Sequence, residues 1–159
     1  MIILPHRKKL IENNFFEFSF NNGNDDEIKP DFEIFKSLNS FEQYYLAEIY
    51  NWDDGVVVLE WIIDSPKCDK GTASNIFWSA EPDYYFDFTN ETIDEYEKDI
   101  FDLLQKILRK FNNDEFKKSK IKFDPIKSGY RIDWKIEHKI WELPDELKKA
   151  TKGIKILNM

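Results

Sequence analysis

Two adjacent aspartates, Asp53 and Asp54, stand in the sequence YNWDDG and are the first candidates for chemistry. A carboxylate pair can bind a hard cation, because magnesium takes one or two protein carboxylates and completes its shell with water. However, neighbouring side chains at a helix start point in different directions, and no calcium-binding loop follows. The sequence favours a structural corner, in which Asn51 ends one helix and Trp52 packs beneath it. Asp53 then caps the next helix, and Gly55 allows close approach of the chain.

Acidic and aromatic residues alternate in the sequence EPDYYFDF, residues 81–88. Aromatic side chains anchor many protein interfaces, although the same residues can equally form a loop that packs on the core. We expect the partner-binding surface to combine acids and tyrosines of this segment with the two aspartates of the corner. Its predicted members are Asp53, Asp54, Glu81, Asp83, Tyr84, Tyr85 and Asp87.

Other candidates for chemistry lack the groups that would complete them. Cys68 needs a base to act as a nucleophile, and the two histidines, His6 and His138, lie far away in the sequence. A buried cysteine acting as a small apolar side chain is the favoured interpretation. Glu60 and Asp64 share one helical face but lack the histidines of a carboxylate metal cage, so a solvated face is favoured.

The common catalytic signatures are absent from the sequence. It contains no phosphate-binding glycine loop, no dinucleotide fingerprint, no H-E-x-x-H, no C-x-x-C and no G-x-S-x-G. We therefore expect a protein without catalytic activity, metal or cofactor. An enzyme with a metal bound at Asp53 and Asp54 is kept as an alternative.

Helical periodicity dominates the segments that must position these residues. A helix is predicted from Ser40 to about Asn51, because Ser40 and Gln43 have the spacing of a capping box. The three valines of segment 53–64 would suit a strand, but its flanking residues favour a helix that ends before Pro66. Further helices are predicted over 31–38 and from Asp69 to about residue 81, where Ala73, Ile76, Phe77 and Ala80 form a buried face.

The longest predicted helix covers residues 92–111 and begins with the capping pair Thr92 and Glu95. Acids fill its first half, whereas Arg109 and Lys110 stand in its last turn, in agreement with the helix dipole. Its apolar stripe consists of Ile93, Tyr96, Ile100, Leu103, Leu104, Ile107 and Phe111.

Alternation with a period of two predicts a short strand at 15–20 and a hairpin of 121–123 with 130–138 around a turn at 124–129. A final short helix is predicted between Pro144 and Gly153. The expected fold is a single domain over 1–159, mainly α-helical in the α+β class. Helical hairpins pack around the long amphipathic helix, and a small β-hairpin lies near the C-terminus.

Charge is distributed unevenly along the 159 residues, whose net charge is −8. Residues 12–102 hold 23 acids and 5 bases, whereas residues 103–159 hold 8 acids and 15 bases. An acidic body repels phosphate backbones and attracts basic proteins, or it only keeps the protein soluble. The basic third is nearly all lysine, which disfavours nucleic-acid binding without excluding it, since arginine is the usual phosphate ligand.

Cellular location follows from three features of the sequence. No stretch approaches the roughly 20 apolar residues that span a bilayer. The short apolar run at the start precedes the basic cluster, which is the reverse of a secretory signal. The one cysteine cannot form an internal disulfide. We expect a cytoplasmic protein without membrane contact, as a monomer or weak homodimer.

The sequences YNWDDG and SPKCDKGTA, with an apolar segment between them, resemble the bacterial domain-of-unknown-function 4274 family. Members of that family show N-P-x-C-D-x-G-T-A in the second motif, where this chain has Ser65 in place of the asparagine. The resemblance is good over about residues 40 to 80. It implies a compact, mostly helical domain with two helical corners set side by side, somewhat like ankyrin-type units. It implies no established activity.

These observations together predict a small binding protein, most readily a bacterial immunity or antitoxin protein that neutralises a basic, nuclease-type toxin. An acidic inhibitor is steered rapidly onto a basic target and can cover its phosphate-binding cleft. The alternative is a regulatory or scaffold module that binds another cellular protein.

Overall fold

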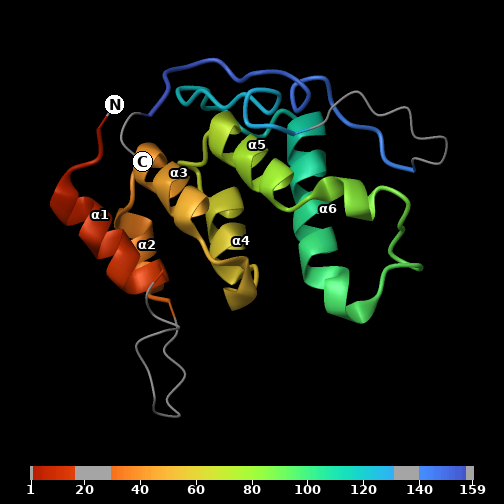
Figure 1. The fold of residues 1–159 in the computed structure, drawn as a ribbon, viewed down its shortest axis with the longest axis horizontal. Helices are drawn as coiled ribbons and strands as arrows, with labels where there is room; N and C mark the ends of the chain where they lie inside the picture. Colours follow the sequence, from red (N-terminus) through yellow and green to blue (C-terminus); the bar gives the residue numbers. More distant parts are fainter. Residues whose placement is uncertain (1, 17–29, 131–139, 157–159) are drawn as a thin grey trace, which may run out of the picture.

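The computed structural model describes residues 2–16, 30–130 and 140–156, and within these ranges it is mainly α-helical (Figure 1). The α-helices are α1 (Pro5–Ile11), α2 (Phe32–Ser37), α3 (Ser40–Ile49), α4 (Val57–Asp64), α5 (Lys70–Ser79) and α6 (Lys98–Asn112). A π-helical turn, η1 (Glu12–Phe16), and three 3-10 turns, η2 (Trp52–Asp54), η3 (Pro82–Tyr85) and η4 (Glu95–Glu97), connect them. Segments 113–130 and 140–156 run along the upper side of the helices in Figure 1.

Helix α5 lies at the centre of the fold, where it contacts α3, α4 and α6. Every residue from Gly71 to Trp78 is buried. The prediction that the helices pack around the long amphipathic helix is wrong, because the helix at the centre is α5. The long helix α6 buries one face and exposes the other. A helix that is charged on one side must lie at the periphery, whereas the small and apolar residues of α5 permit contact on all sides.

Several helix starts differ from the predicted ones. Helix α3 is capped by Asn39, which forms a capping box with Glu42. The predicted pair instead joins α3 to the α4–α5 loop: the Ser40 hydroxyl donates to the Lys67 carbonyl over 2.6 Å, and the Gln43 amide donates to the Ser65 hydroxyl over 2.9 Å. Asn39 directly precedes Ser40, and asparagine and serine both accept first-turn amide hydrogens. The cap therefore forms one residue earlier than predicted.

The corner after α3 also differs in detail. Segment 57–64 is a helix, as predicted, but Asp53 does not cap it, because Asp53 lies inside η2 and Val56 precedes α4 without a side-chain cap. Asn51 caps η2. Gly55 has φ +80°, and a Cβ atom there would meet no atom within 4 Å. The glycine is required by its backbone conformation, which L residues rarely adopt, and close approach of the chain is not the reason.

The start of the long helix is delayed by a 3-10 turn. Asp94 caps η4, and α6 begins at Lys98, so Thr92 and Glu95 do not form the predicted capping pair. The change of helical period turns Tyr96 to solvent, where 96% of it is exposed. Tyr96 is therefore not part of the apolar stripe, whereas the predicted residues from Leu103 to Phe111 are buried.

The predicted β-structure is mostly replaced by other contacts. Phe15 is buried in η1, and the rest of the predicted first strand, 17–20, lies outside the described residues. The second strand of the hairpin, 131–138, also lies outside them. Within them, Ile121 forms an isolated parallel bridge with Ile154 and no hairpin is seen. The residues between Pro144 and Gly153 form turns, not a helix.

The described C-terminal segment, 140–156, forms no helix because several of its polar groups bind residues 120–123 and Trp78. Thr151 donates its amide to the Phe123 carbonyl, and its hydroxyl accepts the Phe123 amide hydrogen, both over 2.8 Å. The Ile154 amide donates to the Lys120 carbonyl over 2.9 Å. The carbonyl of Leu147 accepts the indole N–H of Trp78 in α5. Backbone groups used in this way cannot also close helical turns.

Segment 118–121 docks on the start of α5 through the motif CDKGTA. Asp69 is buried, and its carboxylate accepts the backbone amides of Gly71 at 2.9 Å, Lys120 at 2.6 Å and Ile121 at 3.3 Å. The Lys70 amide donates to the Lys118 carbonyl over 2.8 Å. A Cβ atom on Gly71 would lie 2.4 Å from the Ile121 carbonyl oxygen. The aspartate and the glycine of this motif therefore have structural roles.

Helix α1 is joined to α3 by an ion pair whose strength depends on pH. Arg7 donates to both carboxylate oxygens of Glu42, over 2.6 and 3.0 Å. Burial alone would raise the pKa of Glu42, but the hydrogen bonds from Arg7 and from the Asn39 amide bring it below its ordinary value of 4.5. A carboxyl group with a lowered native pKa stabilises the fold above its unfolded pKa, and this contribution is lost as pH falls through the native value.

The variant Glu42→Gln is expected to lower the free energy of unfolding by about 1–2 kcal/mol at neutral pH. The difference from the wild type should shrink as pH falls from about 6 to about 3, because protonation removes the same charge from the wild type. Urea unfolding across that range measures both effects. Asp83→Asn, at an exposed position, is the control; a Glu42→Gln deficit that is constant with pH would contradict the assignment.

Candidate functional site

A groove of about 450 Å³ opens where the corner after α3 meets the end of α5 and the start of α6. We call it the acidic groove. Its lining residues come from η2, from the end of α5, from η3 and from the η4–α6 segment. They are Trp52, Ser79, Ala80, Glu81, Tyr84, Tyr85, Glu97 and Ile100.

The chain turns into this groove at Glu81, which follows the C-cap of α5 and has φ +50°. Glycine or asparagine is usual in this left-handed conformation, which costs other residues about 1–2 kcal/mol. Pro82 then begins η3. The other described non-glycine residue with positive φ is Asp114, whose carboxylate forms ion pairs with Lys70 and Lys117. Within the described residues the Glu81 carboxylate forms no ion pair.

Tyr85 forms the floor of the acidic groove. Its ring is buried, and its hydroxyl donates to Oε2 of Glu97 over 2.6 Å. Burial, this hydrogen bond and the negative charges of Glu97 and Glu81 raise the pKa of Tyr85 well above its ordinary value. Tyr85 therefore stays neutral, and it holds Glu97 in position.

Tyr84 forms an exposed wall of the groove, with 56% of the residue accessible to solvent. Its ring packs edge-on against Tyr85, with the ring centres 4.9 Å apart, and lies 5.6 Å from the ring of Phe88. Trp52 contributes an indole that is half-buried against the core. The groove thus presents aromatic surface beside carboxylates.

The structure brings together three of the predicted partner-binding residues, Glu81, Tyr84 and Tyr85. Asp53 is exposed and Asp54 is half-buried directly after Trp52, although neither lines the groove. Burial and the nearby charge of Asp54 raise the pKa of Tyr50 to about 12. Asp83 and Asp87 are exposed on either side of the tyrosines and also do not line it. The partner-binding role of all seven residues stays a prediction.

Sequence reasoning missed Glu97 and Ile100, and it assigned Trp52 only to packing. Glu97 and Ile100 are three residues apart, so helical spacing placed them on one face. No local pattern relates that face to residue 52 or to the turn at 81, because these segments meet only through the packing of α5. The one sequence signal for this site was Glu81, a glutamate at a position after a helix end where glycine is common.

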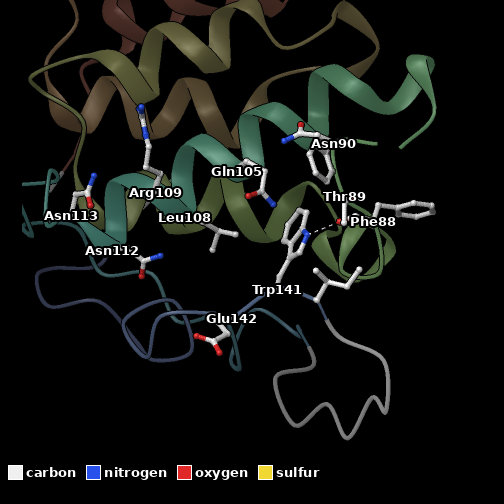
Figure 2. Close-up of a pocket in the computed structure, with 12 residues that line it drawn as sticks. Phe88, Thr89, Asn90, Gln105, Leu108, Arg109, Asn112, Asn113, Trp141 and Glu142 are labelled. Atoms are coloured by element: carbon white, nitrogen blue, oxygen red, sulfur yellow. Dashed lines mark hydrogen bonds between the residues drawn. The ribbon is translucent and has the colours of Figure 1, made fainter. Parts of the chain in front are cut away.

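A second hollow, of about 630 Å³, lies beyond Phe88. Figure 2 shows the Trp141 indole, whose N–H donates to the Phe88 carbonyl over 3.0 Å, and Gln105 and Arg109, which come from α6. Amide side chains of Asn90, Gln105 and Asn112 line much of this hollow. It offers amide groups together with Arg109 and Glu142, whereas the charged residues of the acidic groove are both carboxylates.

The other candidates for chemistry have structural roles. Cys68 is buried, and burial raises the pKa of its thiol, which leaves it protonated and unreactive. Glu60 and Asp64 do share one face, where both accept hydrogen bonds from Lys106, over 2.9 and 3.2 Å. Within the ranges that the structure describes, no group of three or more His, Cys, Asp or Glu residues is arranged to hold a metal ion.

No helix in the described parts of the chain has both the length and the apolar character required to cross a bilayer.

Comparison with known proteins identifies one family. Residues 39–112 match the family model "Domain of unknown function (DUF4274)". The match begins at the cap of α3 and ends with α6, so it contains the acidic groove and both motifs, YNWDDG and CDKGTA. No curated protein and no solved structure is significantly similar to the chain. Residues 39–112 therefore correspond to a DUF4274 domain.

Proposed function

We propose that this protein is a non-enzymatic immunity or antitoxin protein, which neutralises a basic, nuclease-type toxin through its acidic surface. The observation that carries the proposal is the excess of negative charge in residues 81–102, the segment that contributes Glu81 and Glu97 to the acidic groove. Residues 81–102 hold nine acids and one base, Lys98. Eight of the acids are exposed: Glu81, Asp83, Asp87, Glu91, Asp94, Glu95, Asp99 and Asp102.

Most salt bridges of the described residues lie outside residues 81–102 and leave the carboxylates of this segment largely without a basic partner. Lys106 and Lys110 of α6 reach back to Asp64 of α4, over 3.2 and 3.1 Å. Lys70 pairs with Asp114 and Glu146. Among the salt bridges of the described residues, that of Lys98 with Asp102 is the one inside residues 81–102. The acids of the other helices are thus partly neutralised, whereas those of residues 81–102, apart from Asp102, form no salt bridge with the described residues.

A surface of this kind suits a basic partner on two grounds. Uncompensated carboxylates attract a basic protein over several ångströms and accelerate encounter. The exposed Tyr84 and the half-buried Trp52 supply the aromatic contacts that commonly dominate interface energies. A toxin that binds phosphate backbones needs a basic cleft, so charge complementarity links the two surfaces.

Association with the toxin encoded beside this gene is expected to slow at least tenfold as salt rises from about 0.05 to about 0.5 M. The two chains should co-purify, and stopped-flow kinetics with the purified toxin measures the rate. A double variant, Asp83→Asn with Asp87→Asn, should lower the association rate several-fold and change the dissociation rate little, because both residues are exposed charges beside the groove.

The control carries the same change of charge elsewhere on the surface, Glu33→Gln with Glu115→Gln, and both positions are exposed. An association rate that does not depend on salt would oppose the proposal. So would the absence of a toxin gene beside this one, or equal effects of the two double variants.

A further inference from the structure

The acidic groove has the chemical composition of a site for one cationic side chain. Its walls include the rings of Trp52, Tyr84 and Tyr85, and its charged groups are the carboxylates of Glu81 and Glu97. The faces of aromatic rings attract cations, most strongly for tryptophan. No lysine or arginine lines the groove, so no cation of the described chain occupies it.

Three other hollows of the described chain differ in this respect, because each contains its own cations. The hollow in Figure 2 is lined by Arg109. The aromatic hollow beside α2 contains Lys36 and Lys67, and the Lys36 ammonium lies 5.5 Å from the centre of the Phe32 ring. A third hollow is lined by Lys122 and two other lysines. Each of these three hollows also has one carboxylate among its lining residues, Glu142, Asp64 and Asp124 respectively. Of the four hollows, the acidic groove is the one whose charged lining residues are all acidic, so it favours a cation from outside most strongly.

Both carboxylates of the groove have oxygens available to a ligand. The Tyr85 hydroxyl uses Oε2 of Glu97, and Oε1 accepts no hydrogen bond from the described residues. Glu81 forms no ion pair with them, although it stands in a conformation that disfavours glutamate. Residues with a strained backbone conformation are often found at ligand sites. Asp114, which also has a positive φ, uses its carboxylate in ion pairs.

We propose that the acidic groove binds the guanidinium group of one arginine side chain. A guanidinium is planar, so it stacks on the Trp52 and Tyr84 rings, and its N–H donors can serve two carboxylates at once. The compact ammonium of lysine has no planar group that could stack on a ring in this way. The inference rests on the proposed function only for the origin of the arginine, which is the basic partner protein.

Binding is tested on the full chain without the partner, by NMR titration with N-acetyl-arginine amide at constant ionic strength. The indole N–H signal of Trp52, assigned with Trp52→Phe, should shift saturably, with a Kd on the order of 10 mM for so small a ligand. N-acetyl-citrulline amide has nearly the same shape without the charge, and it should leave the signal unchanged. Equal shifts with the two compounds would overturn the assignment.

A pair of variants with the same change of charge separates the groove from the general acidic field. Glu81→Gln should weaken arginine binding about fivefold or more, because a groove carboxylate is lost. Glu91→Gln removes an exposed charge of the same segment outside the groove, and it should change the Kd less than about twofold. Similar effects of the two variants would show only a diffuse attraction and would overturn the proposal.

The two proposals can fail separately. Salt-dependent association with the toxin, together with an arginine titration that shows no effect at Trp52, would leave the proposed function and refute the arginine site. Specific arginine binding that is lost in Glu81→Gln, without any toxin partner, would establish the site and remove the immunity function.

Discussion

Replacing Asp69 with alanine is expected to lower the free energy of unfolding by about 3–5 kcal/mol, since three backbone amides, two of them buried, lose a charged acceptor. Asp69 is completely buried, and its carboxylate accepts the amides of Gly71, Lys120 and Ile121. The first bond caps α5, and the other two attach segment 118–121 to it. The loss combines a missing helix cap with unsatisfied backbone groups on two segments that are far apart in the sequence.

The matched control is Asp31→Ala, because Asp31 caps α2 through the amides of Glu33 and Ile34 but is exposed. Water can replace that cap, so the expected loss is about 1 kcal/mol. Urea unfolding gives both values, and hydrogen exchange at Lys120 and Ile121 should accelerate in Asp69→Ala alone. Equal losses in the two variants would mean that Asp69 is an ordinary cap.

Gly71→Ala is expected to destabilise the protein by about 3 kcal/mol, although alanine favours helix over glycine by about 1 kcal/mol in an exposed helix. The new Cβ atom would lie 2.4 Å from the carbonyl oxygen of Ile121, which is a backbone atom and cannot rotate away. Segment 118–121 would have to move from the start of α5, and the hydrogen bonds to Asp69 would lengthen. Sterics should therefore outweigh helix propensity at this position.

Ser74→Ala is the control, since it also introduces alanine at a buried position of α5. The Ser74 hydroxyl has no hydrogen-bond partner among the described atoms, so its removal should change the stability by less than about 1 kcal/mol or increase it. Thermal and urea unfolding of the two variants give the comparison. A Gly71→Ala protein as stable as the wild type would show that the contact with Ile121 is loose.

Arginine binding and stability should be affected by different residues. Asp69 and Gly71 lie at the start of the ten-residue helix α5, whereas Glu81 follows its end. Mild variants at the start should change the unfolding free energy and leave the Trp52 signal responsive to arginine. Variants at Glu81 should weaken the response of the Trp52 signal to arginine and leave the unfolding free energy nearly unchanged.

The sequence by itself determined where most helices form. The spacing of Ala73, Ile76, Phe77 and Ala80 predicted α5, and the stripe from Ile100 to Phe111 predicted most of α6, because burial of one face imposes a period near 3.6. Asp69 was also correctly predicted as a cap. These features depend on residues within one or two helical turns of each other, so the local sequence pattern is enough to predict them.

Tertiary structure alone decided the ends of the chain and the site. Segment 144–153 contains a helix-like pattern, yet its Thr151 amide binds the Phe123 carbonyl and its Leu147 carbonyl accepts the indole N–H of Trp78. Trp52, Glu81 and Glu97 meet in one groove because α5 holds their segments together. Such contacts join residues far apart in the sequence, and their free energies depend on which surfaces the whole fold brings together, so no local pattern encodes them.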